Sequence, residues 1–288
     1  MPEPACPICH AASAPAGEAH GLRTERMFKL RRCIACDFAF VQEPWTDPEV
    51  YDDAYYAGQG SDPFVDYAFE FEHPDTTIRR YEWRGIVRVV RHLHPAPGKW
   101  LDFGCGNGGL VRYVRDLGAD QVFGFDTGTW AEKARASGLP ILTEDELAAH
   151  DGTFDIVTAV EVIEHIPDPV AVLKRLRRLL KPGGLLFLTT GNLATAPADL
   201  ASWHYAYPEV HVSYFSPRAL TLALEQSGFA ATCPGRIPGW NDIIRFKILK
   251  NLRLREVALW QRMLPWWLLA PLADAKYGVS RHPVGHAV

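Results

Sequence analysis

The chain has 288 residues, enough for one large domain with an appendage or for two modest domains. Hydrophobic residues make up 48% and charged residues 22%, which excludes a mainly disordered chain because enough apolar surface can be buried on folding. The formal net charge of −4 provides no overall basic field for nucleic acid, although local patches remain open. No apolar run approaches the roughly 18 residues that span a bilayer, and the N-terminus lacks the pattern of a secretory signal. We therefore expect a cytoplasmic protein.

The N-terminal region carries four of the six cysteines as two CxxC pairs. They are Cys6, Cys9, Cys33 and Cys36. This spacing is typical of a four-thiolate zinc site, and the metal would supply folding free energy to a segment with few large apolar residues. A reducing compartment argues against disulfides, and four thiolates leave no open position for catalysis. We predict a structural zinc ion in a module over residues 1–44. Two nearby histidines are alternative ligands: His10 and His20.

Residues 45–96 are expected to form an aromatic linker followed by a helix that leads into the core. The aromatic side chains between Tyr51 and Phe71 make a candidate lid over a pocket, or else pack against the core. Asp75 is predicted to cap a helix that runs to about His94. One face of this helix is apolar, and the other is either solvated or a surface for phosphate groups. The basic face contains Arg80, Arg84, Arg88 and Arg91.

From residue 97 the chain alternates short apolar runs with helical patterns, which predicts a parallel sheet with helices on both faces. The predicted strands are Lys99–Phe103, Gln121–Phe125, Leu139–Leu142, Phe154–Ala159 and Leu185–Thr190. The predicted helices are Leu110–Leu117, Trp130–Ser137, Val170–Leu180 and one that starts at Ser216-Pro217. Asp168 and Ser216 each precede a proline and are predicted N-caps. We expect an α/β core over residues 97–235.

Residues 236–288 are less regular and are predicted to form a C-terminal extension. This segment combines basic residues with an apolar stretch around Trp266 and Trp267, which Pro265 and Pro271 interrupt. Burial at a homodimer or domain interface is the first interpretation. The second is seating on a membrane surface, since aromatic and basic residues together favour such an interface.

A glycine-rich turn follows the first predicted strand of the core. Gly104, Gly106 and Gly109 match the dinucleotide pattern G-x-G-x-x-G, which is a weak signal alone. Asp102 argues against a dinucleotide, because its carboxylate would lie beside a pyrophosphate. It suits a ligand with an ammonium group instead. Asp126 ends the second predicted strand, where an acid can accept both hydroxyls of a ribose.

Four blocks of the chain, in order, resemble the class I S-adenosylmethionine-dependent methyltransferases. They are the glycine turn at 102–108, the acid at Asp126, the segment 154–169 with its Glu-Val-Ile-Glu-His sequence, and the segment 180–188 with its Lys-Pro-Gly-Gly sequence. The resemblance covers residues 97–235. It implies a Rossmann-like sheet of seven strands with helices on both faces, S-adenosylmethionine as cofactor, and methyltransferase activity.

The resemblance also implies roles for single residues. The implied cofactor-binding residues are Asp102 for the amino group, Gly104, Gly106 and Gly108 for the methionine part, Asp126 for the ribose, Thr143 and Glu144 near the adenine, and Val160 on the sulfonium side. Glu161 follows Val160 and is implied to face the same side. His165 lies one helical turn further and either enters the pocket or closes that turn.

The segment 205–216 is the main candidate for acceptor chemistry. His211 precedes a Ser-Tyr-Phe-Ser sequence and resembles a histidine of sugar C-methyltransferases, which also carry an N-terminal four-cysteine zinc module. Val210 replaces the carboxylate that precedes that histidine, and the large C-terminal domain of those enzymes is not found here. We predict a small-molecule acceptor, a sugar or another biosynthetic intermediate, methylated at oxygen or carbon. His211 is the candidate general base, or else a packing or capping residue.

Two other functions remain open. One is an RNA methyltransferase that binds RNA with the zinc module and the arginine-rich helix. The net charge and the lack of a long basic segment argue against binding of nucleic acid. The other is a non-catalytic interaction protein that retains the cofactor fold. The intact glycine motif and Asp126 argue against it.

Overall fold

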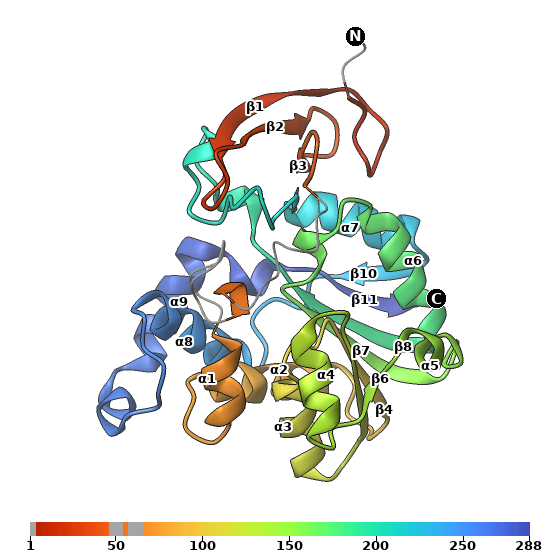
Figure 1. The fold of residues 1–288 in the computed structure, drawn as a ribbon, viewed down its shortest axis with the longest axis vertical. Helices are drawn as coiled ribbons and strands as arrows, with labels where there is room; N and C mark the ends of the chain where they lie inside the picture. The colour runs from red at the N-terminus through yellow and green to blue at the C-terminus, as the bar shows by residue number, and fades with distance from the viewer. Residues whose placement is uncertain (1–3, 46–53, 57–65) are drawn as a thin grey trace.

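A computed structural model describes residues 4–45, 54–56 and 66–288. Within these ranges the strands form two sheets, one of seven strands and one of four (Figure 1). The N-terminal strands lie at the top of Figure 1, and the larger sheet lies in the lower part between its helices. No helix of the described ranges is both long and apolar enough to cross a membrane.

The seven-stranded sheet confirms the predicted α/β fold. Its strands are β4 (Lys99–Phe103), β5 (Gln121–Phe125), β6 (Ile141–Leu142), β7 (Phe154–Val160), β8 (Leu180–Thr189), β10 (Phe229–Thr232) and β11 (Val284–Ala287). They are arranged in the order β10-β11-β8-β7-β4-β5-β6, with β11 antiparallel to both of its neighbours. Strands β4 to β8 pair in parallel, and their apolar runs are buried on both sides, as expected of such a sheet.

Helices cover both faces of this sheet. One face packs against α5 (Glu144–Ala148), α6 (Pro169–Leu179) and α7 (Pro217–Gln226). The other packs against α2 (Arg79–Leu93), α3 (Gly109–Leu117), α4 (Thr129–Ala136) and α8 (Trp240–Asn251), with α9 (Trp266–Tyr277) beside α8. The short helices are α1 (Tyr67–Glu72), η3 (Ile163–His165), η4 (Leu193–Thr195), η5 (Leu200–Ser202), η6 (Leu259–Met263) and η7 (Val279–Arg281).

The predicted strand bounds of the larger sheet hold to within two residues, except at the start of β8 and at β11. Strand β8 begins at Leu180 rather than Leu185, because the Lys-Pro-Gly-Gly segment continues along β7 across a register shift. Strand β11 comes from the segment predicted to be a C-terminal extension. The range 97–235 therefore omits one strand of the sheet.

The start of α2 also corrects the sequence prediction. Asp75 does not cap the helix, which begins at Arg79 after Ile78. Thr77 is held in a bridge with Glu256, so the backbone there cannot enter the helix earlier. The carboxylate of Asp75 pairs with Arg80 instead, at 2.6 Å. The predicted caps Asp168 and Ser216 are confirmed, since each accepts a hydrogen bond from a backbone N–H of the first helical turn.

The basic face of α2 joins α2 to neighbouring elements. Arg84 and Arg88 both bind the carboxylate of Asp242 on α8, at 2.6 and 3.1 Å. Arg91 pairs with Asp120. Since these guanidinium groups have carboxylate partners within the chain, the face is engaged in packing α2 against the rest of the domain.

The four-stranded sheet links the N-terminal region to the core. Its strands are β1 (Ser13–His20), β2 (Met27–Cys33), β3 (Ala39–Val41) and β9 (Ser213–Tyr214), paired in that order and antiparallel. Strand β9 belongs to the segment after β8, two residues beyond His211. The N-terminal sheet is thus completed by the segment predicted to carry acceptor chemistry.

The loop between β1 and β2 closes around the buried carboxylate of Glu209. The backbone N–H groups of Leu22, Arg23 and Thr24 donate to it over 2.8–3.2 Å, and the hydroxyl of Thr24 adds a further bond. Hydrogen bonds to a charged group are worth more than neutral ones. The N-terminal region therefore holds the segment 205–216 at two points, Glu209 and β9.

We expect the substitution Glu209→Gln to lower the free energy of unfolding by about 2–3 kcal/mol, because it removes the charge that several N–H groups share. Chemical denaturation of the full chain would measure this. The matched control is Glu225→Gln on the exposed side of α7, which should change the value by less than about 0.5 kcal/mol. Equal effects of the two substitutions would contradict the role assigned to Glu209.

Candidate active site

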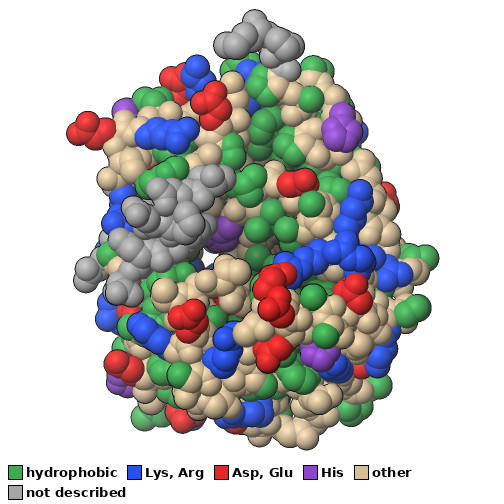
Figure 2. Space-filling model, turned by 45° about the vertical axis from the view of Figure 1, so that its right-hand side comes forward, with side chains coloured by type: hydrophobic (Ala, Val, Ile, Leu, Met, Phe, Trp, Pro, Cys, Tyr) green, Lys and Arg blue, Asp and Glu red, His purple; other side chains and the backbone are tan. Residues whose placement is uncertain are grey.

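A cavity of about 240 Å³ lies beyond the carboxyl ends of β4, β7 and β8. Figure 2 shows the molecule hollowed near the middle of the face that it presents, with a histidine side chain at the rim. Elements α1, α2, α8 and the segment 203–211 contribute the other walls. The structure brings six predicted site residues together here: Asp102, Gly104, Val160, Glu161, His165 and His211.

The glycine-rich turn between β4 and α3 requires glycine for two reasons. Gly104, Gly106 and Gly108 have φ values of +76°, +51° and +75°, in the left-handed region that side chains disfavour. A Cβ on Gly106 would lie 2.7 Å from the ring of Tyr67, and one on Gly104 would lie 2.4 Å from Val162. The turn is therefore packed from both sides, and its backbone lies close to the cavity.

Asp102 places a carboxyl group at the cavity wall. It is buried and accepts a hydrogen bond of 2.7 Å from the hydroxyl of Thr158 on β7. Burial raises the pKa of Asp102 to about 7, with a smaller contribution from the negative charge of Asp126. A cationic group in the cavity would stabilise the ionised form of this carboxyl.

Asp126 supports the glycine turn from outside the cavity lining. Its carboxylate accepts hydrogen bonds from the backbone N–H of Gly106 at 2.9 Å and of Gly128 at 2.7 Å. The ring of Tyr67 stacks on that of Tyr56, with centroids 5.4 Å apart, above this part of the turn. These bonds fix Asp126 beside the glycines, and its role at the ribose stays a prediction.

The predicted adenine contacts also lie outside the cavity lining. Thr143 is the N-cap of α5 and forms a reciprocal capping box with Glu146. Glu144 pairs with Arg175 of α6 at 2.5 Å. Both residues have structural partners in this state, and their role near an adenine stays a prediction.

The described part of the proposed lid contacts the cavity. Tyr55 and Tyr67 line it. Two further aromatic residues of the proposed lid, Tyr51 and Phe64, lie outside the described residues. The lid therefore stays a prediction that rests on these two tyrosines.

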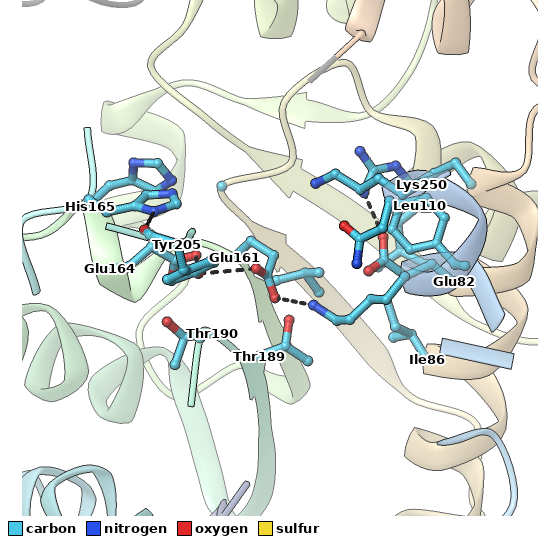
Figure 3. A pocket seen from close by; sticks show the side chains of 18 of the residues that line it. Glu82, Ile86, Leu110, Glu161, Glu164, His165, Thr189, Thr190, Tyr205 and Lys250 are labelled. Carbon is cyan, nitrogen blue, oxygen red and sulfur yellow. Dashed lines mark hydrogen bonds and ion pairs between the residues drawn. The ribbon is translucent and has the colours of Figure 1, made fainter. Parts of the chain in front are cut away.

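Two glutamates on the turn after β7 occupy the centre of the cavity (Figure 3). Glu161 has a φ of +54° and accepts hydrogen bonds from Lys247 at 3.0 Å and from the phenol of Tyr205 at 3.2 Å. Burial alone would raise the pKa of Glu161, but the ammonium groups of Lys247 and Lys250 lower it below its ordinary range.

The second glutamate, Glu164, is fully buried and binds the phenol of Tyr205 at 2.5 Å through one oxygen. Its other oxygen has no hydrogen-bond partner among the described residues. Burial and the nearby charge of Glu161 raise the pKa of Glu164 to about 8. The two carboxyls therefore differ in character: one is an ion paired with lysine, and the other holds a proton at neutral pH.

Two histidines face the glutamates with defined ring orientations. Nδ1 of His165 lies 2.9 Å from the carbonyl of Val210, and Nδ1 of His211 lies 2.8 Å from the carbonyl of Tyr205. A carbonyl only accepts, so each Nδ1 carries the hydrogen and each neutral ring has its lone pair on Nε2. Such rings can accept a proton or ligate a metal. Glu164, His165 and His211 each offer one ligand atom within 4.8 Å of the others.

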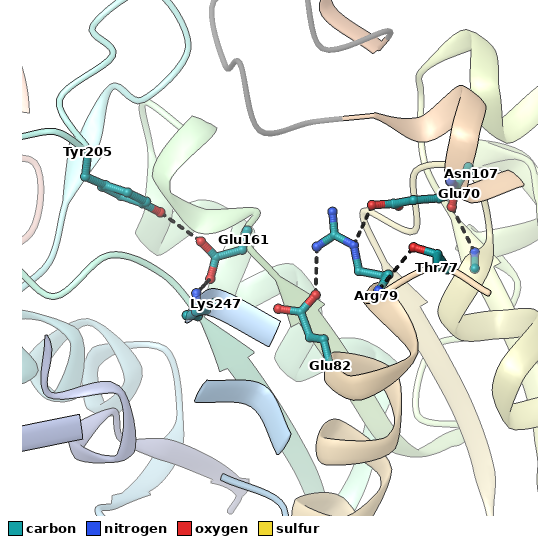
Figure 4. Close-up of polar contacts among 9 residues, drawn as sticks. Glu70, Thr77, Arg79, Glu82, Asn107, Glu161, Tyr205 and Lys247 are labelled. Atoms are coloured by element: carbon teal, nitrogen blue, oxygen red, sulfur yellow. Dashed lines mark hydrogen bonds and ion pairs between the residues drawn. The ribbon is translucent and has the colours of Figure 1, made fainter. Parts of the chain in front are cut away.

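Several cavity residues were not singled out from the sequence. Arg79 binds Glu70 at 2.8 Å and Glu82 at 2.7 Å inside the wall, as Figure 4 shows, and Lys247 reaches Glu161 from α8. In sequence these residues look like ordinary charged positions. Arg79 is the first residue of α2, and Lys247 lies 86 residues after Glu161, whose charge it neutralises. No local sequence pattern therefore identifies either residue.

The four cysteines of the two CxxC pairs meet at one point. Their sulfurs lie within 4.8 Å of one another, with Cys6 and Cys36 at 3.6 Å and Cys9 and Cys33 at 3.4 Å, and all four are free thiols. A tetrahedron with zinc–sulfur bonds near 2.3 Å has sulfur–sulfur edges of about 3.8 Å. Backbone N–H groups of residues 8, 35 and 36 point at these sulfurs. The donor set fits zinc, and the alternative ligands His10 and His20 are not in this cluster.

The sheet order, the glycine turn with its two acids and the cavity beside them define a class I S-adenosylmethionine-dependent methyltransferase. The chain belongs to the family described as a methyltransferase domain, whose model matches residues 76–233, more than half of the chain.

Curated relatives agree with this class. A ubiquinone biosynthesis O-methyltransferase of Xanthomonas axonopodis pv. citri is 40% identical over 123 residues, which cover 39% of this chain and 51% of that protein. The protein of the same name from Methylococcus capsulatus is 34% identical over 142 residues, covering 45% and 60%. The chain thus spans about half the length of the curated relatives it matches. The solved structure of a SAM-dependent methyltransferase from Aquifex aeolicus is 18% identical, with a TM-score of 0.44, and covers 60% of this chain and 94% of that one.

The raised pKa of Glu164 makes stability depend on pH. Between the ordinary value of 4.5 and the folded value of about 8, the folded chain binds more protons than the unfolded chain, so stability falls as pH rises through this window. In Glu164→Gln this titration is absent, and the free energy of unfolding should fall less between about pH 5 and about pH 8. Denaturation at several pH values would measure it.

Glu132→Gln on exposed α4 is the control and should keep the wild-type pH dependence. Parallel curves for the wild type and Glu164→Gln would show that Glu164 titrates normally.

Proposed function

We propose that this protein transfers a methyl group from S-adenosylmethionine to a hydroxyl oxygen of a small-molecule acceptor, with His211 as general base. The observation that carries the proposal is the orientation of His211: its Nδ1–H is bound to a backbone carbonyl, and the ring lines the cavity beside the glycine turn. The names of the curated relatives support an oxygen acceptor.

The residues around the glycine turn fit the parts of this cofactor. Asp102 would bind the ammonium group, and Arg79, which also lines the cavity, would offer a cation for the carboxylate. Asp126 would bind the ribose hydroxyls, and Thr143 and Glu144 would lie near the adenine. When bound, S-adenosylmethionine supplies an electrophilic methyl group on a sulfonium.

The reaction needs one proton removed from the acceptor as its oxygen forms the new bond to carbon. His211 would take that proton on Nε2, and the carbonyl of Tyr205 would stabilise the resulting imidazolium through Nδ1–H. Glu161 would keep its negative charge near the reacting atoms, because Lys247 holds it ionised. The proton then leaves to solvent, which restores the neutral ring.

The alternatives are supported less well. The arginine face of α2, which an RNA methyltransferase would use for phosphates, is engaged with acids of the same chain. Methylation of carbon or of a sugar rests only on the resemblance around His211 and in the four-cysteine module.

We also propose that the four cysteines bind one structural zinc ion in the module over residues 1–44. The metal would tie the first CxxC pair to the second, which joins β2 to β3, and β3 pairs with β9. Because β9 begins two residues after His211, the zinc ion would act on the site by positioning this histidine.

His211→Asn should lower turnover by about 10²- to 10⁴-fold. The asparagine amide can still donate to the carbonyl of Tyr205, but Nε2 is lost. Cofactor affinity should stay unchanged, since the residues proposed to hold the cofactor lie at the ends of β4, β5, β6 and β7 and on α2, and not in the segment 205–216. Formation of S-adenosylhomocysteine with a panel of phenols, catechols and sugars would report turnover, and calorimetry would report binding.

The control His92→Asn lies on the exposed side of α2 and should leave both quantities unchanged. Asp126→Ala should abolish cofactor binding. Wild-type turnover in His211→Asn would exclude this residue as the base, and failure of the wild type to bind the cofactor would exclude the enzyme function itself.

Removing the zinc ion should lower the melting temperature and reduce turnover together. We expect about one zinc per chain by elemental analysis, and its loss in Cys36→Ser. Cys233→Ser, at an exposed thiol outside the cluster, is the control and should keep the metal. A purified wild-type chain that contains no zinc and is stable without it would contradict the proposal.

A further inference from the structure

An apolar surface is exposed on the segment between α8 and the end of α9. Among the described residues, seven of the twelve exposed large hydrophobic side chains lie between residues 252 and 272. They are Leu252, Leu259, Trp260, Met263, Trp267, Leu268 and Leu272. We name these seven residues the apolar patch. Such a concentration is unusual for surface side chains, which are normally scattered.

The packing of α9 explains why part of the patch is exposed. Ala270 is buried against α8 and the sheet, and Trp266 packs under the guanidinium of Arg245, 4.6 Å from its ring. Other side chains of the helix are exposed, Trp267 to 77% and Leu272 to 60%. Met263, just before α9 on η6, is exposed to 86%.

The segment that carries the patch is rich in positive charge. Residues 250–273 contain four cations and one acid, Glu256, whereas the whole chain has a net charge of −4. Lys250 lines the cavity and Arg255 pairs with Asp66 at 3.1 Å, which leaves Arg253 and Arg262 as the exposed cations beside the patch. The partner that covers the patch should therefore be apolar and should carry negative charge where these two arginines lie.

We propose that the apolar patch binds the surface of an anionic lipid bilayer. Indole and thioether side chains insert at the level of the headgroups, and arginines around them bind lipid phosphates. A second copy of the chain fits less well, because a two-fold interface would bring Arg253 and Arg262 of both copies together. The proposal does not depend on the acceptor or on the catalytic base.

The bilayer surface would lie beside one wall of the cavity. Helix α8 contributes Lys247 and Lys250 to the cavity lining, and α9 contributes Ala273. Helix α9 carries three of the patch residues, and α8, against which it packs, lines the cavity. Binding would hold this wall against the membrane.

Flotation of the full chain with vesicles tests the proposal. We expect binding to vesicles in which about a third of the lipid is phosphatidylglycerol, and weaker binding to phosphatidylcholine alone. The double substitution Arg253→Gln and Arg262→Gln should weaken binding to anionic vesicles about 30-fold, since each cation near the surface is worth about 1 kcal/mol. Met263→Ser with Trp267→Ser should weaken it at least about tenfold.

Leu117→Ser removes an exposed leucine at the end of α3 and is the control that should bind as the wild type does. Absence of binding to anionic vesicles at low salt would overturn the proposal, as would equal binding by all variants. A stable dimer that Met263→Ser with Trp267→Ser converts to monomer would also overturn it, in favour of a second copy on the patch.

Discussion

The pairing of β3 with β9 is the contact on which the arrangement of the cavity depends. It joins the N-terminal sheet, which has little apolar core of its own, to a segment of the methyltransferase domain that has no helix or long strand to fix it. The same segment continues into the hydrogen bond from Val212 N–H to the carbonyl of Glu164, at 2.8 Å. The N-terminal sheet therefore helps to set the position of both His211 and Glu164, through β9 and through the hydrogen bonds to Glu209.

The cavity also contains more charge than a protein interior usually tolerates, and pairing offsets the cost of burying it. Lys247 neutralises Glu161, and Arg79 lies between Glu70 and Glu82. These pairs fix the position of the charges that line the cavity. Charges held in place in this way stabilise a reaction more than groups that must reorganise around it.

Much of the secondary structure of the core can be predicted from local sequence patterns. Strands β4 and β5 match their predicted bounds, because each is a short apolar run between turn residues, and the glycine turn follows from spacing alone. The features that local patterns missed depend on distant partners. Asp75 fails as a cap because Glu256 holds the backbone at Thr77, and Lys247 gains its role only where α8 meets β7. The four residues of β11 are too few to show an alternation of apolar and polar side chains. They form a strand because they lie between β10 and β8 and pair with both.

The position of β11 has a consequence for how the chain is made. Leu185 on β8 pairs with His286, about 100 residues later, so during translation the edge of β8 emerges long before its partner. At 5–20 residues per second this interval lasts roughly 5–20 s. Throughout it, an apolar parallel sheet presents an open edge to the crowded surroundings of the ribosome. The nascent domain is thus exposed to misassembly for seconds, a period in which chaperones that shield strand edges would have most effect.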